Sequence, residues 1–524
     1  MLQQFTTFKG ELPRASARLL PDDYAQLAVN CRMETGALEP INASTFVTDL
    51  VTPRDTIYLN GATWLAYAGT VAVLPGPTAT DRLYIFGDGV PRMRANDTNY
   101  PLALPAPATA PTIANRTAPD EDALETILYA VTYVTSFGEE SAPSPLSNAL
   151  EWSEGVIVDM TDIPAPPAGR AITKMRIYRS NTSATGVTDL FFVEEADVAT
   201  TYSHDLNFNE INEVIATTAF TTPPDDLRGV ISMPNGMFVG HTDREILFCE
   251  PYQPQAWPSA YRLLVDYDIV GLAAFGSQLA VMTKGTPYRG QGSHPDTFQL
   301  ERIEENLPCV SARSIVDLGY AAAYASTDGL VTITGTGAQV VSKPLFTPKH
   351  WHQMDPASMF AAQHKGRYVF GFTGSLPSGD ETCGIVDLSG DTPFFLRSGI
   401  APVSFYHDLR TSILYYQASA DNKLYHWDDY DAPASMSLSW KSAPLDVGFP
   451  IGFAAVYLEG EATGAFSCTI IADGNNVATV TTLNQPVRLP SGFKSQHWEV
   501  AIEGMVTITT AAIATSLSDL ASLR

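Results

Sequence analysis

The stretch NGMFVGHTDREILFCEP, residues 235–251, contains the pattern on which the fold class depends. Two short apolar runs, MFVG and ILFC, flank the polar sequence HTDRE, and an Asn-Gly pair starts the stretch. Short apolar runs separated by turn residues predict neighbouring strands of a buried sheet. Because similar stretches recur along the chain, the interpretation extends well beyond this one hairpin.

Five other stretches have the same arrangement of a small residue or glycine, an apolar run, a polar turn and a second apolar run. They are residues 62–94, 275–292, 327–342, 364–388 and 410–429. In the stretches from residue 235 onward, the leading runs begin at Gly236, Gly276, Gly329, Gly366 and Ser412. The intervals between these positions are 40, 53, 37 and 46 residues. The four-stranded blade of a β-propeller repeats at ~40–50 residues. The spacing therefore predicts an irregular β-propeller, and a series of unrelated meanders is the alternative that the sequence leaves open.

Two regions interrupt this repeat. The first follows a Pro/Ala/Thr-rich linker and has alternating runs such as YAVTYVT, residues 129–135, which are typical of an immunoglobulin-like or fibronectin III-like sandwich. The second, near the C-terminus, alternates at period two and predicts a separate small β-sandwich. The predicted all-β organisation is an N-terminal anchoring segment (1–60), a first propeller part (61–104), the inserted acidic sandwich (105–226), the main propeller part (227–432) and the C-terminal β-sandwich (433–524).

The chain is strongly acidic. It has 31 basic and 57 acidic residues, for a formal net charge of −26. Residues 106–220 alone have 5 basic and 17 acidic side chains, for a net charge of −12. A negative surface opposes binding to nucleic acid phosphates and to anionic membranes. If this protein handles DNA, we expect it to guide the duplex rather than to grip it.

Cysteine usage indicates where the protein folds. The five cysteines are far apart and form no CxxC pair, which predicts folding in a reducing compartment without a disulfide framework or zinc site. The N-terminal residues lack the apolar core of a signal peptide, and no run approaches the ~18 apolar residues of a membrane span. We therefore expect a soluble protein made in a cytoplasm.

Candidate catalytic chemistry is sparse. The sequence HWH, residues 350–352, would place two imidazoles on one side of a strand as two ligands of a metal, although a surface strand end is the simpler interpretation. Acidic groups at 22–23, 139–140, 194–195 and 427–431 could supply paired carboxylates for glycoside hydrolysis or form a solvated surface. No nucleophile elbow, phosphate-binding loop, zinc-protease motif or calcium loop is present. The sequence predicts no enzyme, no cofactor and no metal site.

A distinctive segment, GELPRASARLLPDDYAQLAVNCRMETGALEP, lies near the N-terminus at residues 10–40. Its part from residue 22 to residue 32 predicts a helix of about two turns with Asp22 or Asp23 as the N-cap. Prolines stiffen the segment, and its apolar residues offer a strip that can be buried. Its arginines lie among carboxylates, so the segment carries no net positive charge.

This segment, with TWLAY (63–67) and RLYIFGDGVPR (82–92) after it, resembles the start of the tail nozzle proteins of short-tailed bacteriophages. YAVTYVTSFGEESAPSPLS, residues 129–147, and the C-terminal sequences SWKSAPLDV and RLPSGFKSQHWEVAIEG are similar to sequences of such phage proteins. The resemblance covers both ends of the chain and much of its middle. It implies a propeller interrupted by a sandwich, and it brings no catalytic residue.

The resemblance also implies an assembly and a location. Nozzle proteins form a ring, commonly a homo-hexamer, at the tail tip of the virion, next to the tail adaptor ring and the tail fibres or spikes and facing the host envelope. The ring encloses and gates the channel through which viral genomic DNA leaves, without sequence-specific binding. Six copies of this chain would carry six times −26, or −156. An acidic wall of that kind would repel the duplex toward the channel axis.

Two sets of residues are candidates for roles in such a ring. The subunit-interface candidates are Arg14, Arg18, Arg32 and Tyr24, because scarce arginines could pair with carboxylates of the same or of a neighbouring subunit; packing within one chain is an equal alternative. Loops at 374–382 and 289–297 are gate candidates by their length and composition. Their flexible positions would be Gly374, Ser375, Gly379, Gly290 and Gly292.

Two rival functions stay open from the sequence. A receptor-binding tail protein would use the inserted sandwich as its adhesin, but such proteins usually trimerise through long fibrous repeats, and none is visible. A glycan-active propeller enzyme of the sialidase type often repeats the turn S-x-D-x-G-x-T-W. The sequence contains one partial match, STDGLVT, at residues 326–332.

Overall fold

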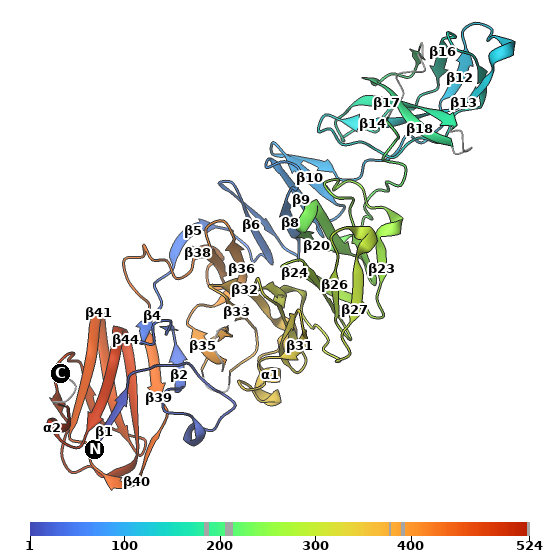
Figure 1. Cartoon of the computed structure of the whole chain (residues 1–524). Helices are drawn as coiled ribbons and strands as arrows, with labels where there is room; N and C mark the ends of the chain where they lie inside the picture. Colours follow the sequence, from blue (N-terminus) through green and yellow to red (C-terminus); the bar gives the residue numbers. More distant parts are fainter. Residues whose placement is uncertain (183–187, 205–212, 377–378, 389–392, 521–524) are drawn as a thin grey trace. The chain divides into compact units, whose positions relative to one another are not determined.

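The computed structural model describes residues 1–182, 188–204, 213–376, 379–388 and 393–520. In these residues the α-helices are α1 (Pro348–Gln353) and α2 (Leu517–Leu520), and most other regular structure is β-strand (Figure 1). The prediction of an all-β protein is confirmed. Within the same residues, no helix has the length and apolar character needed to cross a membrane. The chain divides into two compact units, unit 1 (Met1–Thr70, Ala273–Arg289 and Glu301–Arg524) and unit 2 (Val71–Leu272 and Gly290–Leu300).

Many strands form groups of four that pair in chain order. After a hairpin of β6 (Thr56–Asn60) and β7 (Thr63–Tyr67), the first three groups are β8 (Ala72–Pro75), β9 (Arg82–Phe86), β10 (Arg92–Ala95) and β11 (Thr98–Pro101); β20 (Arg228–Met233), β21 (Met237–His241), β22 (Glu245–Phe248) and β23 (Arg262–Leu264); and β24 (Ile269–Phe275), β25 (Gln278–Thr283), β26 (Tyr288–Gln291) and β27 (Gln299–Arg302). The next three are β28 (Val316–Asp317), β29 (Ala322–Ser326), β30 (Gly329–Thr334) and β31 (Gly337–Val340); β32 (Phe360–His364), β33 (Arg367–Gly371), β34 (Cys383–Asp387) and β35 (Phe394–Ser398); and β36 (Pro402–Asp408), β37 (Ile413–Ala418) and β38 (Lys423–His426) with β5 (Thr45–Asp49).

The repeat seen in the sequence corresponds to particular strands of these groups. Four stretches contain the two central strands of a group, namely β21–β22, β25–β26, β33–β34 and β37–β38. Residues 327–342 contain β30 and β31, the last two strands of theirs. Residues 62–94 are not one unit, because β7 pairs with β6 whereas β8 to β10 belong to the following sheet. The short turn between β7 and β8 looks like a hairpin turn in the sequence, which conceals this boundary.

Turn geometry explains the small residue at the head of each repeat. The backbone angle φ is positive at all five leading positions, Gly236 (69°), Gly276 (58°), Gly329 (147°), Gly366 (77°) and Ser412 (57°). Each residue lies at the start of a strand or within two residues before it. Glycine adopts positive φ without steric cost, and other residues rarely do. The sequence repeat is therefore a repeat of turns, which needs no long-range information to be visible.

The regular structure of residues 1–60, which belong to unit 1, is mainly β-strand. The elements are β1 (Leu2–Phe5), which pairs with β44 (Ser495–Ala514), a 3-10 turn at Ala17–Leu19, β2 (Ala25–Val29), which lies between β35 and β39 (Leu438–Ser442), and the pair β3 (Cys31–Arg32) and β4 (Glu39–Pro40). β5 follows and pairs with β38. The N-terminal segment is thus tied to three separate parts of unit 1.

The helix predicted at residues 22–32 is wrong, because these residues contain β2 and β3. β2 pairs antiparallel with β39 along most of its length and parallel with β35 at Val29. Neighbours on both sides satisfy its backbone N–H and C=O groups. An isolated helix of about two turns is marginal in water and has no comparable partner, so the strand is favoured.

The C-terminal strands are connected to earlier strands by sheet pairing, and whether they form the predicted separate sandwich stays a prediction. β39, β40 (Leu445–Ile451), β41 (Ala455–Ala472), β42 (Asn475–Val480), β43 (Val487–Arg488) and β44 belong to one 12-stranded sheet with β1, β2 and β32 to β35. β2 makes the junction, since it pairs with β35 on one side and β39 on the other. Alternation at period two predicts strands but not their neighbours, so the sequence could not show this junction.

One apolar core joins both ends of the chain. The 18-residue β41 and the 20-residue β44 pair with each other, with bulges at Glu459/Gly460 and Ala462/Phe466 that let such long strands bend. Their inward side chains pack with residues of the N-terminal segment and of β33 to β35, including Ala28, Val369 and Leu396. The terminal segment is therefore a structural part of this core.

Two sheets enclose a separate core in unit 2, within residues 112–204. The strands are β12 (Thr112–Asn115), β16 (Val158–Thr161) and β19 (Tyr202–His204) in one sheet, β14 (Tyr129–Thr135), β17 (Ile172–Thr182) and β18 (Thr188–Asp197) in the other, and the pair β13 (Glu125–Ile127) and β15 (Leu150–Trp152). Tyr129, Trp152 and Ile177 lie in the shared core. Each of the five basic residues of this acidic region has a carboxylate partner: Arg116–Asp159, Arg170–Glu139, Lys174–Asp197, Arg176–Glu140 and Arg179–Glu125.

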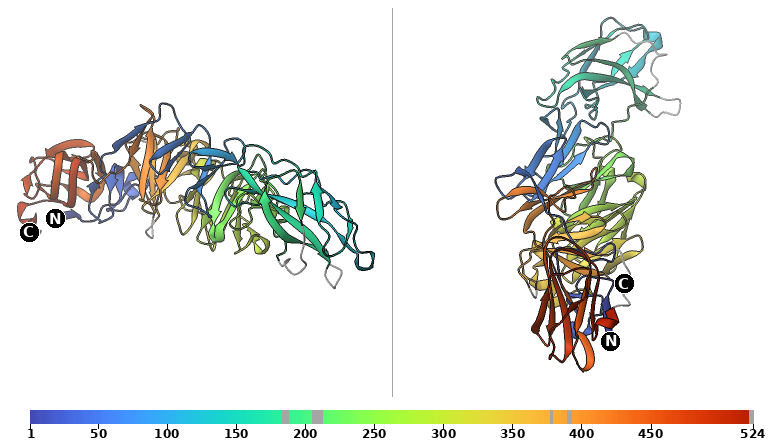
Figure 2. Two further views of the ribbon diagram at one scale, coloured as in Figure 1. Left: turned by 90° about the horizontal axis from the view of Figure 1, so that it is seen from above. Right: turned by 90° about the vertical axis from the view of Figure 1, so that its left-hand side faces the viewer.

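The two ends of the described chain lie close together (Figure 1, Figure 2). The Met1 ammonium lies 2.8 Å from Thr515 Oγ1 and 3.1 Å from Asp519 Oδ2. These contacts extend the pairing of β1 with β44 to the end of the strand. Both ends of this part of the chain therefore stabilise the same sheet.

Gly504→Ala tests the bend in β44. Gly504 has a φ of +121°, and a Cβ there would lie 2.3 Å from the Ala465 carbonyl oxygen. We expect the substitution to lower the free energy of unfolding by about 2–4 kcal/mol, measured by denaturant titration of tryptophan fluorescence. Gly69→Ala is the matched control, because its Cβ would meet nothing within 4 Å. Equal stability of the two variants would contradict the assignment of strain to this bend.

Candidate functional site

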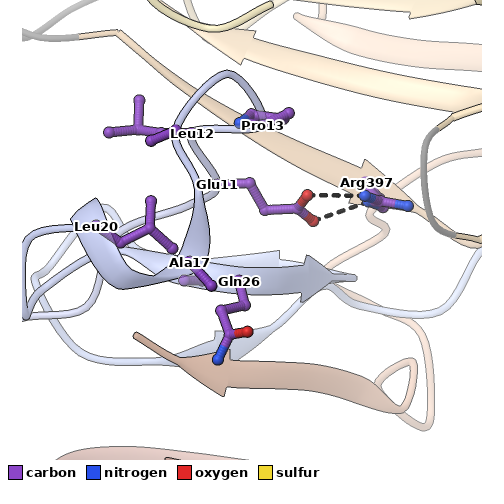
Figure 3. Close-up of a pocket in the computed structure, with 9 residues that line it drawn as sticks. Glu11, Leu12, Pro13, Ala17, Leu20, Gln26 and Arg397 are labelled. Carbon is purple, nitrogen blue, oxygen red and sulfur yellow. Dashed lines mark hydrogen bonds and ion pairs between the residues drawn. The ribbon is translucent and has the colours of Figure 1, made fainter. Parts of the chain in front are cut away.

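The N-terminal segment is held by a buried ion pair. Arg397 Nε lies 2.8 Å from Glu11 Oε1, and Arg397 Nη2 lies 2.9 Å from Glu11 Oε2, with both side chains 2% exposed (Figure 3). Glu11 comes from the N-terminal loop and Arg397 from β35. The sequence positions are 386 residues apart. A two-point contact of this kind fixes both the position and the orientation of the loop.

Backbone contacts surround this pair and complete the anchor. The Glu11 N–H donates to the Phe395 carbonyl at 2.7 Å, and the Phe395 N–H donates back at 3.0 Å. The Ala28 N–H donates to Glu11 Oε1 at 2.9 Å, so the same carboxylate also holds β2. Burial raises the pKa of the Glu11 carboxyl, and the Arg397 guanidinium acts in the opposite direction.

A cavity of about 160 Å³ lies beside the ion pair, inside the bend of the N-terminal loop. Leu12, Pro13, Ala17 and Leu20 contribute apolar surface to it, and Gln26 contributes an amide (Figure 3). The Gln26 amide donates to the Ser442 carbonyl at 2.7 Å and to Glu499 Oε1 at 2.6 Å. The cavity wall is thus braced from both the loop and the C-terminal strands.

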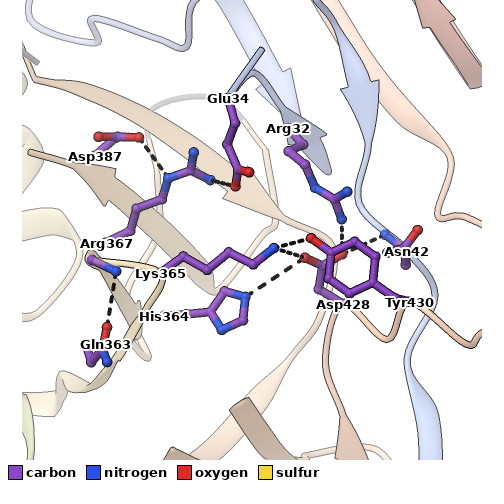
Figure 4. A network of polar contacts seen from close by, with 11 residues as sticks. Arg32, Glu34, Asn42, Gln363, His364, Lys365, Arg367, Asp387, Asp428 and Tyr430 are labelled. Carbon is purple, nitrogen blue, oxygen red and sulfur yellow. Dashed lines mark hydrogen bonds and ion pairs between the residues drawn. The ribbon is translucent and has the colours of Figure 1, made fainter. Parts of the chain in front are cut away.

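A second polar cluster, centred on Asp428, also contacts the N-terminal segment (Figure 4). Its carboxylate accepts hydrogen bonds from Arg32, from the Asn42 N–H at 3.0 Å and from Lys365 at 3.3 Å, and it lies 3.9 Å from His364 Nε2. Burial raises the pKa of the Asp428 carboxyl, but His364, Arg32, the Asn42 N–H and Lys365 outweigh it and hold the pKa at about 2. This carboxylate therefore binds residues from two separate parts of the chain.

Arg367 and Tyr430 border the Asp428 cluster. Arg367 Nε lies 2.7 Å from Asp387 Oδ2, and its Nη1 lies 3.2 Å from Glu34 Oε1 (Figure 4). The Tyr430 ring, which is 67% exposed, has Lys365 Nζ 4.7 Å and the Arg32 guanidinium 5.1 Å from its centroid. A cation over the face of an aromatic ring is attracted by the ring's π electrons. The cluster therefore adds a second attachment between the N-terminal segment and the β-sheets.

The four predicted interface residues have different environments. Arg32 pairs with Asp428, and Tyr24 is buried with Lys9 Nζ 4.8 Å from its ring centroid. Arg14 Nη1 donates to the Lys343 carbonyl at 2.6 Å. Arg18 is exposed beside an open groove of about 520 Å³ and has no ion-pair partner among the described residues. Three of the four thus contact their own chain, and a contact of Arg18 with another subunit stays a prediction.

The described glycines of the two predicted gate loops at 289–297 and 374–382 lie close to other residues. Gly290 lies in β26, not in a loop, and packs against Phe298, because a Cβ on it would lie 2.4 Å from that ring. Gly292 also contacts Phe298. In the other loop, a Cβ on Gly374 would lie 2.1 Å from the Gln353 carbonyl, and the Ser375 N–H donates to the same oxygen at 2.9 Å. Glycine at these positions permits close packing, whereas the sequence suggested flexibility.

The rest of that loop gives one further contact. A Cβ on Gly379 would lie 2.2 Å from Glu381 Oε2 and 2.7 Å from Arg397 Nη1. Pro377 and Ser378, within the predicted gate loop, lie outside the described residues. Whether either loop gates a channel stays a prediction.

The sequence HWH forms part of helix α1, not a strand, so the predicted geometry of its imidazoles is wrong. Thr347 caps the helix by accepting the His350 N–H, and Trp351 is buried with its Nε1 donating to the Ser326 carbonyl at 2.8 Å. Histidines two positions apart lie on opposite sides of a helix. Among the described residues, no group of three or more His, Cys, Asp or Glu side chains could hold a metal.

The predicted carboxylate pairs are divided among separate partners. Glu139 pairs with Arg170, whereas Glu140 accepts hydrogen bonds from Arg176 and Tyr178. The other acidic neighbours are divided in the same way: Asp23 with Lys9, Glu194 with Tyr202, Glu195 with Arg176, and Asp429 with Thr45. Carboxylates engaged in this way are poorly placed to work as an acid and base pair on one substrate.

The Glu11–Arg397 pair is not visible in the sequence. Glu11 stands there only as one of the carboxylates among the arginines of residues 10–40. Arg397 lies in the apolar sequence FFLRS, residues 394–398, which forms β35. A lone charge in such a run is a usable signal, because a buried charge needs a partner. The identity of that partner could not be inferred, since only the fold brings these residues together.

Comparisons with known proteins give no family for this chain. No family model and no curated protein matches the sequence. The extracellular domain of a one-component system from B. thetaiotaomicron is 10% identical, covers 88% of this chain and 47% of its own, and has a TM-score of 0.25. That of a hybrid two-component system from B. thetaiotaomicron is 10% identical, covers 82% of this chain and 58% of its own, and has a TM-score of 0.20.

This chain thus spans about half the length of those structures. Likeness at such scores bears on neither the fold nor the function of this chain.

Glu11→Gln tests the buried ion pair. The change removes the negative charge that Arg397 contacts at two points, and a buried charge that loses its counterion is costly. We expect a loss of about 3–5 kcal/mol in the free energy of unfolding, measured by denaturant titration. Asp23→Asn, which breaks the half-exposed Lys9–Asp23 pair, should cost less than about 1 kcal/mol.

A paired replacement distinguishes charge from shape at the same site. Glu11→Leu with Arg397→Met should recover a large part of the loss, because neither residue then carries a buried charge. Recovery should be incomplete, since the Ala28 N–H loses its acceptor. A double variant less stable than Glu11→Gln would show that the pair is required for its shape rather than for its charge balance.

The pKa of Asp428 predicts a pH dependence of stability. Its folded pKa of about 2 lies below the ordinary value of 3.8, so the ionised carboxylate stabilises the fold above about pH 4. That contribution is lost as the pH falls from about 4 toward 2. The stability difference between wild type and Asp428→Asn, measured by denaturant titration from pH 7 to pH 2, should be constant at first and then narrow. A difference that does not change over this range would contradict the assignment.

Proposed function

We propose that this chain is a structural virion protein that forms the nozzle ring at the distal end of a short phage tail and encloses the channel for DNA ejection. One observation carries the proposal. Residues 10–40, which resemble nozzle proteins, are also the residues that join the sheets of unit 1 through Glu11 and β2. A terminal segment attached at many points suits a component that must keep its shape within a ring.

The strand groups support a propeller as the scaffold of this nozzle. In the described residues there are six groups of four strands, and β5 supplies the last strand of the β36 to β38 group. In a propeller, a strand from the N-terminal side that completes the last blade closes the ring of blades. The two sheets around Trp152 support an inserted sandwich of the immunoglobulin or fibronectin III type.

The negative charge of the chain supports a channel wall that does not bind DNA. Duplex DNA carries about one negative charge per 1.7 Å of axis, and basic side chains on a channel wall would bind it and slow its passage. Here the net charge is −26, and the basic residues of the acidic region are all engaged with carboxylates. A ring of such chains would keep the duplex away from its wall.

Imaging tests the proposal directly. Negative-stain electron microscopy of the purified protein and of virions should show a six-fold ring, located at the tail tip of the particle next to the adaptor ring. A trimeric spike on mature particles, or isolated monomers there, would rule the nozzle out. Incubation with host-surface glycans separates the two rivals, because turnover indicates an enzyme and saturable binding alone indicates an adhesin.

Arg18→Glu tests the remaining interface candidate. Arg18 has no ion-pair partner among the described residues, so its charge reversal should leave the melting temperature unchanged. If Arg18 pairs with a carboxylate of the next copy, the variant should weaken ring assembly about tenfold or more in sedimentation velocity. Lys349→Glu is the matched control, since Lys349 is also exposed and undergoes the same change of charge. Equal assembly of both variants would remove Arg18 from the interface.

A further inference from the structure

Two adjoining loops at one end of the C-terminal strands of unit 1 each expose a phenylalanine. The first loop is VGFPIG, residues 447–452, which is the bulged end of β40 together with Gly452, and it presents Phe449 with 64% of its surface exposed. The second, PSGFKS, residues 490–495, presents Phe493 with 44% exposed. Large apolar side chains exposed together at loop ends are uncommon in a soluble protein and mark contact surfaces.

The strand register makes these loops neighbours and makes the first one protrude. Asp446 pairs with His497 and Ile451 pairs with Ser495, so five steps along β40 correspond to two steps along β44. The extra residues, which include Phe449, bulge away from the sheet. The second loop lies against the first, because a Cβ on Gly452 would be 2.6 Å from the Phe493 carbonyl oxygen.

Both loops have firm bases and open tips. Phe453, next to the first loop, is 3% exposed, and its ring centroid lies 5.1 Å from that of the buried Trp498. At the tips, Gly448 and Gly492 have positive φ, and a Cβ on either would meet nothing within 4 Å. The two phenylalanines are therefore exposed at the tips, while the neighbouring Phe453 is anchored in the core.

Charge is depleted around these tips. Residues 447–453 and 490–496 contain one charged side chain, Lys494, and no Asp or Glu. The whole chain has 57 acidic residues. The nearest acidic residue along the first loop is the exposed Asp446 at its base, whose carboxylate accepts a hydrogen bond from the Gly448 N–H at 3.0 Å. The two tips themselves carry no carboxylate, a group that would make contact with an apolar medium costly.

The exposed area helps to choose the partner. Together the two phenylalanines expose about as much surface as one whole side chain, roughly 150–250 Å². A stable protein–protein interface needs about 800 Å² on each partner, which is several times the surface that the two phenylalanines expose. A lipid surface accepts single apolar side chains and needs no complementary shape. We propose that Phe449 and Phe493 insert into the interfacial region of a lipid bilayer.

The mode of binding follows from the charges. Since the chain carries a net charge of −26, anionic lipids oppose its approach, and apolar insertion provides the attraction. Binding to zwitterionic vesicles should therefore change little with salt, and binding to anionic vesicles should increase with salt as repulsion is screened. A single copy binds weakly, and several copies on one assembly bind more strongly because their sites are linked. The inference stands on this surface and does not require a ring.

Vesicle flotation tests the proposal with the full chain. Phosphatidylcholine vesicles at millimolar lipid should carry the wild-type protein, and the double variant Phe449→Ser with Phe493→Ser should float at least tenfold less. The control is Phe46→Ser with Leu409→Ser, because those residues are 58% and 81% exposed elsewhere in unit 1. This control should float within twofold of wild type. A wild-type protein that does not float, or a tip variant that floats as well as wild type, would overturn the proposal.

Two further measurements keep the result interpretable. Phe449→Trp should show quenching by brominated phosphatidylcholine beyond that of the wild-type tryptophans, and Phe449→Leu with Phe493→Leu should keep flotation if the serine variant misfolds. If the tip variant instead changes the oligomeric state in the absence of lipid and the wild type does not float, another copy of the chain covers the tips and the lipid proposal is wrong. Imaging of the ring is independent, so the proposed function and this inference can fail separately.

Discussion

The buried pair of Glu11 and Arg397 is the constraint on which the arrangement of unit 1 depends. Removing two charges from water costs several kcal/mol for each ion, and only close geometry offsets that cost. The two-point contact, together with the Ala28 N–H, supplies such geometry. A shifted N-terminal loop would leave Arg397 buried with an incomplete set of acceptors. Register errors in this region are therefore costly, and one position of the loop is selected.

The position of β2 follows from that of the loop. Because Glu11 bonds to Phe395 through the backbone and to Ala28 through its side chain, β2 is aligned beside β35. β39 then pairs on the other side of β2 and connects the C-terminal strands to the same sheet. The Asp428 cluster repeats this principle a short distance along the chain, where Arg32 and the Asn42 N–H share one carboxylate. Polar contacts specify the path of the segment, and the apolar core beneath it supplies most of the stabilisation.

Local features could be predicted from the sequence, and the choice of neighbours could not. Turns with positive φ use glycine for steric reasons, so positions such as Gly236 and Gly366 marked strand starts correctly. Apolar runs gave the all-β class for the same local reason. Residues 22–32 fit a helix by their local pattern, whereas β35 and β39, which are distant in the sequence, decide the outcome. The HWH stretch shows the reverse case, where Thr347 and Pro348 start a helix in a mainly β protein.

Many basic side chains form ion pairs with carboxylates of the same chain. This pairing matters equally for all three candidate functions, a nozzle, an adhesin and a glycan-active enzyme. Arg397, Arg32 and Arg367 hold the fold of unit 1, and the basic residues among 106–220 neutralise carboxylates of their own region. A basic residue that is committed to a buried or half-buried carboxylate cannot also bind a phosphate group without releasing it. The chain has 57 acidic and 31 basic residues, and the excess negative charge therefore lies at the surface. If the chain lines a DNA channel as proposed, its acidic surface repels the duplex. The exposed Arg18, Phe449 and Phe493 are then the candidates for contacts with other molecules.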